Sequence, residues 1–172
     1  MLTSTPERYG RVAVVLHWSI ALLILVALAS GFAADNAGAG GQAPLTVHAI
    51  SGLLAAVLTL ARLAWWLMAD TRPASPSGVT PFQHGAARVV HALFYIVPLG
   101  MAASGIGMLA LSGAGAQLVS GAAAPLPDFD TLLPRTPHGL GARALIALIV
   151  LHVGAAIVHH RAIPGGFLQR MT

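Results

Sequence analysis

The stretch that most constrains this chain is HGLGARALIALIVLHVGAAIVHHR, residues 138–161. Its apolar core is about long enough to cross a bilayer as one helix, which needs ~20 residues. It carries His138 and His152, which are nearly four helical turns apart, so both imidazoles leave one face and their backbones stand ~21 Å apart along the axis. An ionisable side chain inside a membrane span indicates a functional site.

Two imidazoles at two depths favour a membrane cytochrome, because paired histidines ligate haem iron and b-type haem needs no covalent tether. Our first hypothesis is two haems stacked across the membrane, with this segment giving one ligand to each. The alternative for this segment is that both histidines only hydrogen-bond to neighbouring helices. The rest of the chain has to decide between the two.

Composition identifies an integral membrane protein. Of the 172 residues, 56% are hydrophobic and only 8% are charged, whereas soluble domains carry about 25% charged residues. The length suits a single domain, residues 1–172, of four spans with short loops. Cysteine is absent, which excludes disulfides, Cys-ligated iron–sulfur clusters and haem attached through Cys-x-x-Cys-His.

Apolar segments with few charges predict transmembrane helices at approximately 12–33, 45–68, 85–111 and 138–160. The fold class is therefore all-α, an integral membrane four-helix bundle with two b haems inside it. The first segment resembles a cleavable signal peptide in its basic start. It is longer than a signal h-region and carries His17-Trp18, so we keep it as the first helix.

All nine basic residues are arginines, and they are divided unevenly between the ends of the expected bundle. One side receives seven of them: Arg8, Arg11, Arg62, Arg72, Arg88, Arg161 and Arg170. The other side receives Arg135 and Arg143. The positive-inside rule then places both termini in the cytoplasm of a multi-pass protein of the bacterial inner membrane. Because the arginines do not cluster with polar neighbours, the net charge of +4 indicates topology and not nucleic-acid binding.

Depth pairs four of the histidines. His17 lies on the inner half of the first helix and His152 on the inner half of the fourth. His48 and His138 lie near the outer starts of the second and fourth helices. Depth alone therefore pairs His17 with His152 and His48 with His138, which predicts two bis-histidine sites.

Glycines lie beside two of these histidines. Gly52 follows His48 by four residues and Gly141 follows His138 by three, so each lies on the ligand face of its helix. A missing side chain there would leave room for a flat macrocycle. The alternative is ordinary small-residue packing between membrane helices.

Three further histidines lie on the inner half of the bundle. His91 has no evident mate, and we expect it to be a non-ligand near the inner haem. His159 and His160 end the fourth helix, and His159 shares the face of His152 about two turns away. The two either line a pocket beside the inner haem or lie at the membrane interface.

These residues together resemble the bacterial cytochrome b561 family, small four-helix di-haem membrane cytochromes related to the cytochrome b subunits of nickel hydrogenases and formate dehydrogenases. The likeness covers nearly the whole chain. The matching pieces are Arg11-x5-His17-Trp18, His48-x3-Gly52, Arg62-Leu63-x-Trp65, His91-x3-Tyr95, Ser104-Gly105, His138, Gly141, Leu151-His152 and His159-His160.

The resemblance implies two haem b groups, whose iron ligands would be the histidines already paired by depth: His17, His48, His138 and His152. Some members are similar to superoxide oxidases, which take an electron from superoxide outside and reduce ubiquinone near the inner haem. In such members a quinone pocket would involve the positions of Arg11 and His159.

Arginines are the expected partners of the haem propionates, because an aligned Arg–carboxylate pair is strong in a low dielectric. Outside, these would be Arg135 and Arg143. Inside, the candidates are Arg11, Arg72, Arg88 and Arg161. Arg62 is expected to snorkel to the interface beside Trp65 and Trp66.

Three functions remain open. The leading one is an enzyme, a quinone-reducing oxidoreductase of the superoxide oxidase type. The second is an electron-transfer subunit for a periplasmic dehydrogenase or soluble cytochrome, which the outer Asp35, Asp128 and Asp130 favour because they would dock a basic partner. The third is a haem-free transporter or assembly protein, which would be colourless.

Overall fold

The computed structural model describes residues 1–37, 41–75, 78–121, 125–162 and 168–171. Within these ranges the regular structure is entirely helical. The helices are α1 (Arg11–Asn36), α2 (Gln42–Met68), α3 (Pro81–Ser112), α4 (Ala114–Ser120) and α5 (Arg135–Ala162), with 3-10 turns η2 (Phe129–Thr131) and η3 (Leu168–Met171). Helices α1, α2, α3 and α5 are long and apolar enough to cross a membrane, as the predicted four-helix membrane architecture requires.

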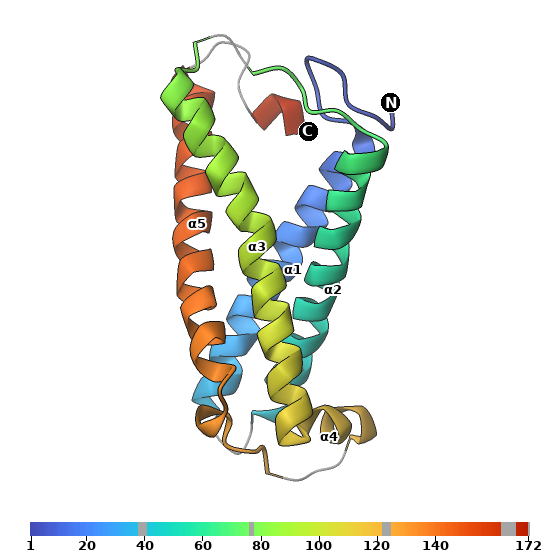
Figure 1. The fold of residues 1–172 in the computed structure, drawn as a ribbon, viewed down its shortest axis with the longest axis vertical. Coiled ribbons are helices and arrows are strands. Elements are labelled where there is room, and N and C mark those ends of the chain that lie inside the picture. The colour runs from blue at the N-terminus through green and yellow to red at the C-terminus, as the bar shows by residue number, and fades with distance from the viewer. Residues whose placement is uncertain (38–40, 76–77, 122–124, 163–167, 172) are drawn as a thin grey trace.

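The four long helices form an elongated bundle (Figure 1). Helix α1 packs along α2, α3 packs along α5, and α3 also contacts α2. Both termini lie at the same end of the bundle, and α4 lies at the opposite end. We call the end with the termini the inner end and the other the outer end, following the orientation that the arginines predict.

All four long helices begin before the expected spans, and in three of them a proline lies in the first turn. Pro81 is at the first position of α3, behind a Thr80–Gln83 capping box. Pro44 and Pro137 likewise lie in the first turns of α2 and α5. Proline fits there because the first N–H groups of a helix have no intrahelical acceptor.

The connection expected to be a loop after residue 111 contains the short helix α4. Gly113 ends α3 with φ of +74° and Gly121 ends α4 with φ of +67°. Glycine adopts this left-handed conformation without the steric cost that a Cβ imposes. The two glycines therefore let the chain turn sharply at the outer end, where the residues between them form one more helical segment.

Apolar side chains cover much of the outside of the bundle, as suits a lipid environment. Several hydroxyl groups in the spans are satisfied within their own helix, as in the bonds that Ser51 and Thr59 donate to the carbonyls of Val47 and Ala55. The buried core is formed by Ile20, Ile24, Ala55 and Leu145. Leu145 is midway in sequence between His138 and His152, so this core lies between two levels of histidines.

A network of hydrogen bonds holds the chain together at the inner end. The Asp70 carboxylate accepts from the Ser4 backbone at 2.7 Å, the Ser4 hydroxyl at 2.8 Å and the Trp65 indole at 3.0 Å. Partial burial acts to raise the pKa of Asp70, but the hydrogen bonds from Ser4, Thr71 and Trp65 hold it below its ordinary value. Asp70 thereby fastens the N-terminal segment to the end of α2.

Candidate functional site

The outer histidine pair joins the start of α2 to the start of α5. The ring centroids of His48 and His138 are 5.8 Å apart, with an interplanar angle of 72°. His48 Nδ1 lies 2.7 Å from the Ala27 carbonyl of α1, and His138 Nδ1 lies 3.0 Å from the Met101 carbonyl of α3. A carbonyl only accepts, so each Nδ1 carries the proton and each Nε2 keeps a free lone pair.

Two glycines, whose role beside the histidines the sequence did not predict, make room for these rings. A Cβ at Gly31 would lie 2.7 Å from His48 Nδ1, and a Cβ at Gly105 would lie 3.3 Å from His138 Cε1. At Gly31 any side chain would displace the ring from its carbonyl. Gly31 and Gly105 therefore set the position of the two outer imidazoles, one from α1 and one from α3.

The inner pair joins α1 to α5 and has a third imidazole beside it. The ring centroids of His17 and His152 are 6.2 Å apart. His91 of α3 lies 5.6 Å from His152, and Phe94 lies 5.2 Å from it in an edge-on contact. The structure thus brings together both pairs predicted from depth and adds His91 to the inner level.

A guanidinium, and not a carbonyl, faces the inner His17. Arg62 Nη1 of α2 lies 2.9 Å from His17 Nδ1. Because guanidinium can only donate, His17 Nδ1 accepts this bond. Tyr95 of α3 also hydrogen-bonds the Arg62 side chain. The sequence predicted that Arg62 snorkels to the membrane interface. In the structure its side chain points into the bundle and lies beside His17, a proposed haem ligand.

Both pairs fit the axial ligation of a haem. Two metal–nitrogen bonds of about 2 Å and two ring radii of about 1 Å place bis-imidazole centroids about 6 Å apart. In the described part of the chain, no cluster of three or more His, Asp or Glu could hold a bare metal ion. Two imidazoles occupy two coordination positions of a six-coordinate iron, and the four nitrogens of a porphyrin would occupy the other four.

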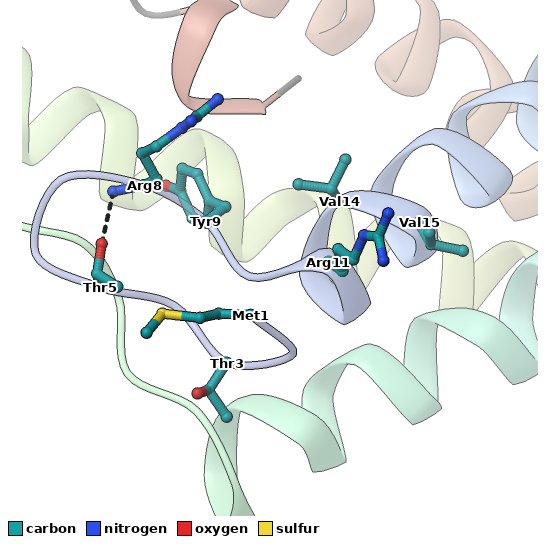
Figure 2. A pocket seen from close by; sticks show the side chains of 8 residues that line it. All are labelled: Met1, Thr3, Thr5, Arg8, Tyr9, Arg11, Val14 and Val15. Carbon is teal, nitrogen blue, oxygen red and sulfur yellow. Dashed lines mark hydrogen bonds between the residues drawn. The ribbon is translucent and has the colours of Figure 1, made fainter.

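A pocket of about 500 Å³ lies at the inner end, between the N-terminal segment and the start of α1. It is lined by Met1, Thr3, Thr5, Arg8, Tyr9, Arg11, Val14 and Val15. Figure 2 shows Arg11 and Val15 on the first turns of α1, beside the looped segment in which the Arg8 N–H donates to Thr5 Oγ1 at 3.2 Å. Burial raises the pKa of Tyr9, so its hydroxyl stays a donor at neutral pH.

His159 is not among the residues that line this pocket. It lies at the inner end of α5, whereas Arg11 begins α1. The neighbouring His160 has a buried Nδ1 without a hydrogen-bond partner among the described residues. The joint pocket of Arg11 and His159 that the sequence predicted therefore stays a prediction.

The other residues that the sequence predicted at the haem sites are Gly52, Gly141 and Arg143, and their surroundings differ. Nothing described lies within 4 Å of the position that a Cβ would take at Gly52, while a Cβ at Gly141 would meet Met101 Cγ at 2.7 Å. Gly52 therefore faces open space, and Gly141 permits close packing of α5 on α3. Arg143 is exposed on α5, and its pairing with a propionate stays a prediction.

Arg135, expected at the outer propionates, is held by two carboxylates. It bonds Asp35 of α1 at 2.8 Å and Asp130 of η2 at 2.9 Å. These bonds tie the end of α1 to the start of α5 across the outer end. The guanidinium charge is thereby compensated by Asp35 and Asp130, and the pairing of Arg135 with a haem propionate stays a prediction.

Comparison with known proteins gives two findings. Residues 8–172 match the family described as prokaryotic cytochrome b561. The chain is also 27% identical over 174 aligned residues to a Yersinia pestis protein named "Probable superoxide oxidase CybB", covering 96% of each chain. The family match spans all four long helices and every histidine discussed above.

Proposed function

This chain belongs to the prokaryotic cytochrome b561 family, and we propose that it passes electrons across the membrane through two bis-histidine haem b sites, from superoxide outside to ubiquinone inside. The observation that carries the proposal is the pair of imidazole contacts, 5.8 Å at the outer level and 6.2 Å at the inner level. The name of the Yersinia pestis relative supports superoxide as the donor.

The protein holds and orients the cofactors. His48 and His138 would ligate the outer haem, and His17 and His152 the inner one; each haem, when bound, supplies a one-electron carrier. At the outer site, donation from Nδ1 to a backbone carbonyl fixes the ring and raises the basicity of Nε2. The apolar core around Leu145 excludes water between the two levels.

Quinone reduction needs protons as well as electrons. The acceptor gains two electrons and two protons, and the protons require a titratable group close to water. His159 suits this role because a neutral imidazole carries both an N–H donor and an acceptor nitrogen, and this one lies at the inner end of α5. Arg11, at the mouth of the inner pocket, would donate a hydrogen bond to a quinone carbonyl.

The decisive test uses the purified protein. A dithionite-reduced spectrum with a haem-to-protein ratio establishes the sites, and superoxide with a ubiquinone analogue in the same sample establishes the reaction. We expect reduction of the analogue at a rate that depends on superoxide. A coloured protein that binds haem but does not turn over superoxide would remove superoxide as the donor and leave the haem sites intact.

The outer end favours a second candidate, electron uptake from a basic soluble protein. Asp35 and Asp130 have side-chain exposures of 64% and 79%, and Asp128 is exposed beside them. Exposed carboxylates attract a cationic partner and repel an anion such as superoxide. Co-purification of such a partner, together with no superoxide turnover, would favour this candidate.

A further inference from the structure

Arg62 carries a positive charge into the membrane-spanning part of α2, and no ion pair joins it to a carboxylate among the described residues. The chain has five acidic residues, Glu7, Asp35, Asp70, Asp128 and Asp130. In the part of the chain that the structure describes, ion pairs join Arg135 to Asp35 and Asp130, and Asp70 is held by Ser4, Trp65 and Thr71. The titratable groups nearest Arg62 are two tyrosines, Tyr95 and Tyr9, which are neutral at pH 7, and the like-charged Arg72. A buried charge without an anionic partner is costly.

One donor of Arg62 also lacks an acceptor. Its Nε is buried and has no hydrogen-bond partner among the described residues. Its Nη1 is directed at His17 Nδ1 at 2.9 Å. On a guanidinium, Nε together with the neighbouring Nη2 forms an edge that can receive a carboxylate in a two-point interaction, and Nη1 lies away from that edge.

The Arg62–His17 bond cannot persist when His17 ligates a metal. Ligation by Nε2 requires its lone pair, so the ring proton must then be on Nδ1. Two N–H donors would face each other, because guanidinium cannot accept. Seating of the haem therefore releases Nη1 from His17 and leaves both Arg62 donors in need of an anion beside the inner site.

From these contacts we infer that Arg62 binds a propionate carboxylate of the inner haem. The inference rests on the proposed inner site at His17 and His152. The carboxylate compensates the buried charge and accepts from the Nε edge, where the buried donor has no partner among the described residues, and Tyr95 holds the guanidinium from α3. The same positive charge stabilises the reduced, less positive iron, so Arg62 also raises the potential of the inner haem above the value it would have without it.

The test compares Arg62→Met with Arg88→Met in the purified holoprotein. Arg88 is an exposed arginine at the inner start of α3, and the sequence made it a rival candidate for the same propionate. Two properties are measured: the rate of haem transfer to excess apomyoglobin, and the midpoint potential of each haem by spectroelectrochemistry. Arg62→Met should speed loss of one haem by roughly tenfold to a hundredfold and lower that haem's potential.

Arg62→Lys separates the charge from the two-point contact. It should keep the inner potential close to that of the wild type while haem loss remains faster, because an ammonium supplies the charge without the planar fork. If Arg62→Met does not fold, this variant decides alone. A slower or unchanged haem loss together with an unchanged potential overturns the inference.

Other outcomes are also decisive. Arg88→Met with the effects expected of Arg62→Met would assign the propionate to Arg88. If Arg62→Met changed retention of anionic lipid but neither haem property, the anion would be a lipid phosphate and the inference would fail. A wild-type protein that bound no haem would refute the proposed function, not this assignment alone.

Discussion

The outer and inner halves of the bundle hold their histidines in different ways. At the outer level, backbone carbonyls of Ala27 and Met101 orient His48 and His138. At the inner level, a guanidinium faces His17, and a third imidazole and a phenyl ring contact His152. The outer pair is positioned by two backbone carbonyls, with the Ser104 hydroxyl also 3.0 Å from His138 Nδ1, and both Nε2 lone pairs are available to a metal. The inner pair is set by side chains that can change partner.

This difference has a chemical consequence. A carbonyl acceptor pushes electron density onto the imidazole and lowers the potential of a bound iron, whereas a nearby positive charge raises it. The outer haem should therefore have the lower potential and the inner haem the higher. Electrons that enter from outside would then run downhill toward the end of the bundle that holds Arg11 and His159.

The largest effects should come from removing one ligand at each level. His48→Ala should remove the outer haem only, because His138 alone cannot complete six-coordination, and His17→Ala should remove the inner haem only. Haem content should fall by half in each variant. The midpoint potential of the haem that remains should differ between the two variants, because each has lost a different haem. Depletion of the same haem by both substitutions would contradict the pairing.

His159→Ala tests the inner proton donor. A positioned acid–base group contributes about 10²-fold or more to a rate, so quinone reduction should slow to that extent. Both haems should stay bound and reducible from outside, as shown by stopped-flow spectra. A wild-type rate would place the proton donor elsewhere, and a lost haem would make His159 a ligand.

The charge of the outer end distinguishes the two candidate donors. Asp35→Asn with Asp130→Asn removes two negative charges and frees Arg135. Superoxide-driven reduction should rise several-fold at low ionic strength, and the gain should vanish in salt, because steering is screened. Reduction by a basic soluble cytochrome should fall under the same conditions, and this opposite response identifies which donor the outer end suits.

His91→Ala should have a smaller effect, limited to the inner level. His91 contacts His152 at 5.6 Å, so its loss should change the potential of the inner haem while both haems stay bound. Redox titration against the wild type measures the change. His91 would prove to be a ligand in place of His17 if this variant lost a haem.

The smallest effect concerns the inner hydrogen-bond network. Asp70→Asn should lower stability by about 1 kcal/mol, because Ser4 and Trp65 lose a charged acceptor. The folded pKa of Asp70 is lowered, so its contribution is present above the unfolded pKa of about 3.9 and is lost as the pH falls through the folded value. The unfolding temperature of Asp70→Asn should therefore lie below that of the wild type at pH 7, and the difference should be much smaller at pH 3.

Most of the fold could be predicted because membrane spans are encoded locally. Length, hydropathy and arginine placement were enough to predict four membrane helices and their orientation. The depth of His17 and His152 was enough to predict that they lie close together. Depth follows from position along one helix, so it needs no knowledge of packing. The helix starts were missed by a few residues because Pro44, Pro81 and Pro137 were assigned to loops.

The contacts that distinguish the two levels could not be predicted in this way. Whether Arg62 points to lipid or to His17 depends on the rotation of α2 about its own axis against α1. Gly31 and Gly105 matter only because a histidine from another helix approaches them. The ion pairs of Arg135 join residues from three elements. Each depends on how the helices pack, which a single sequence does not specify locally.

The central claim is that each of the two histidine levels holds one haem. It is tested most directly by the ratio of haem b to protein in the purified full-length chain, read from the dithionite-reduced spectrum and quantitative amino-acid analysis. We predict two haems per chain, both low spin. One haem per chain, or a colourless protein, would contradict the two-level assignment of His17 with His152 and His48 with His138.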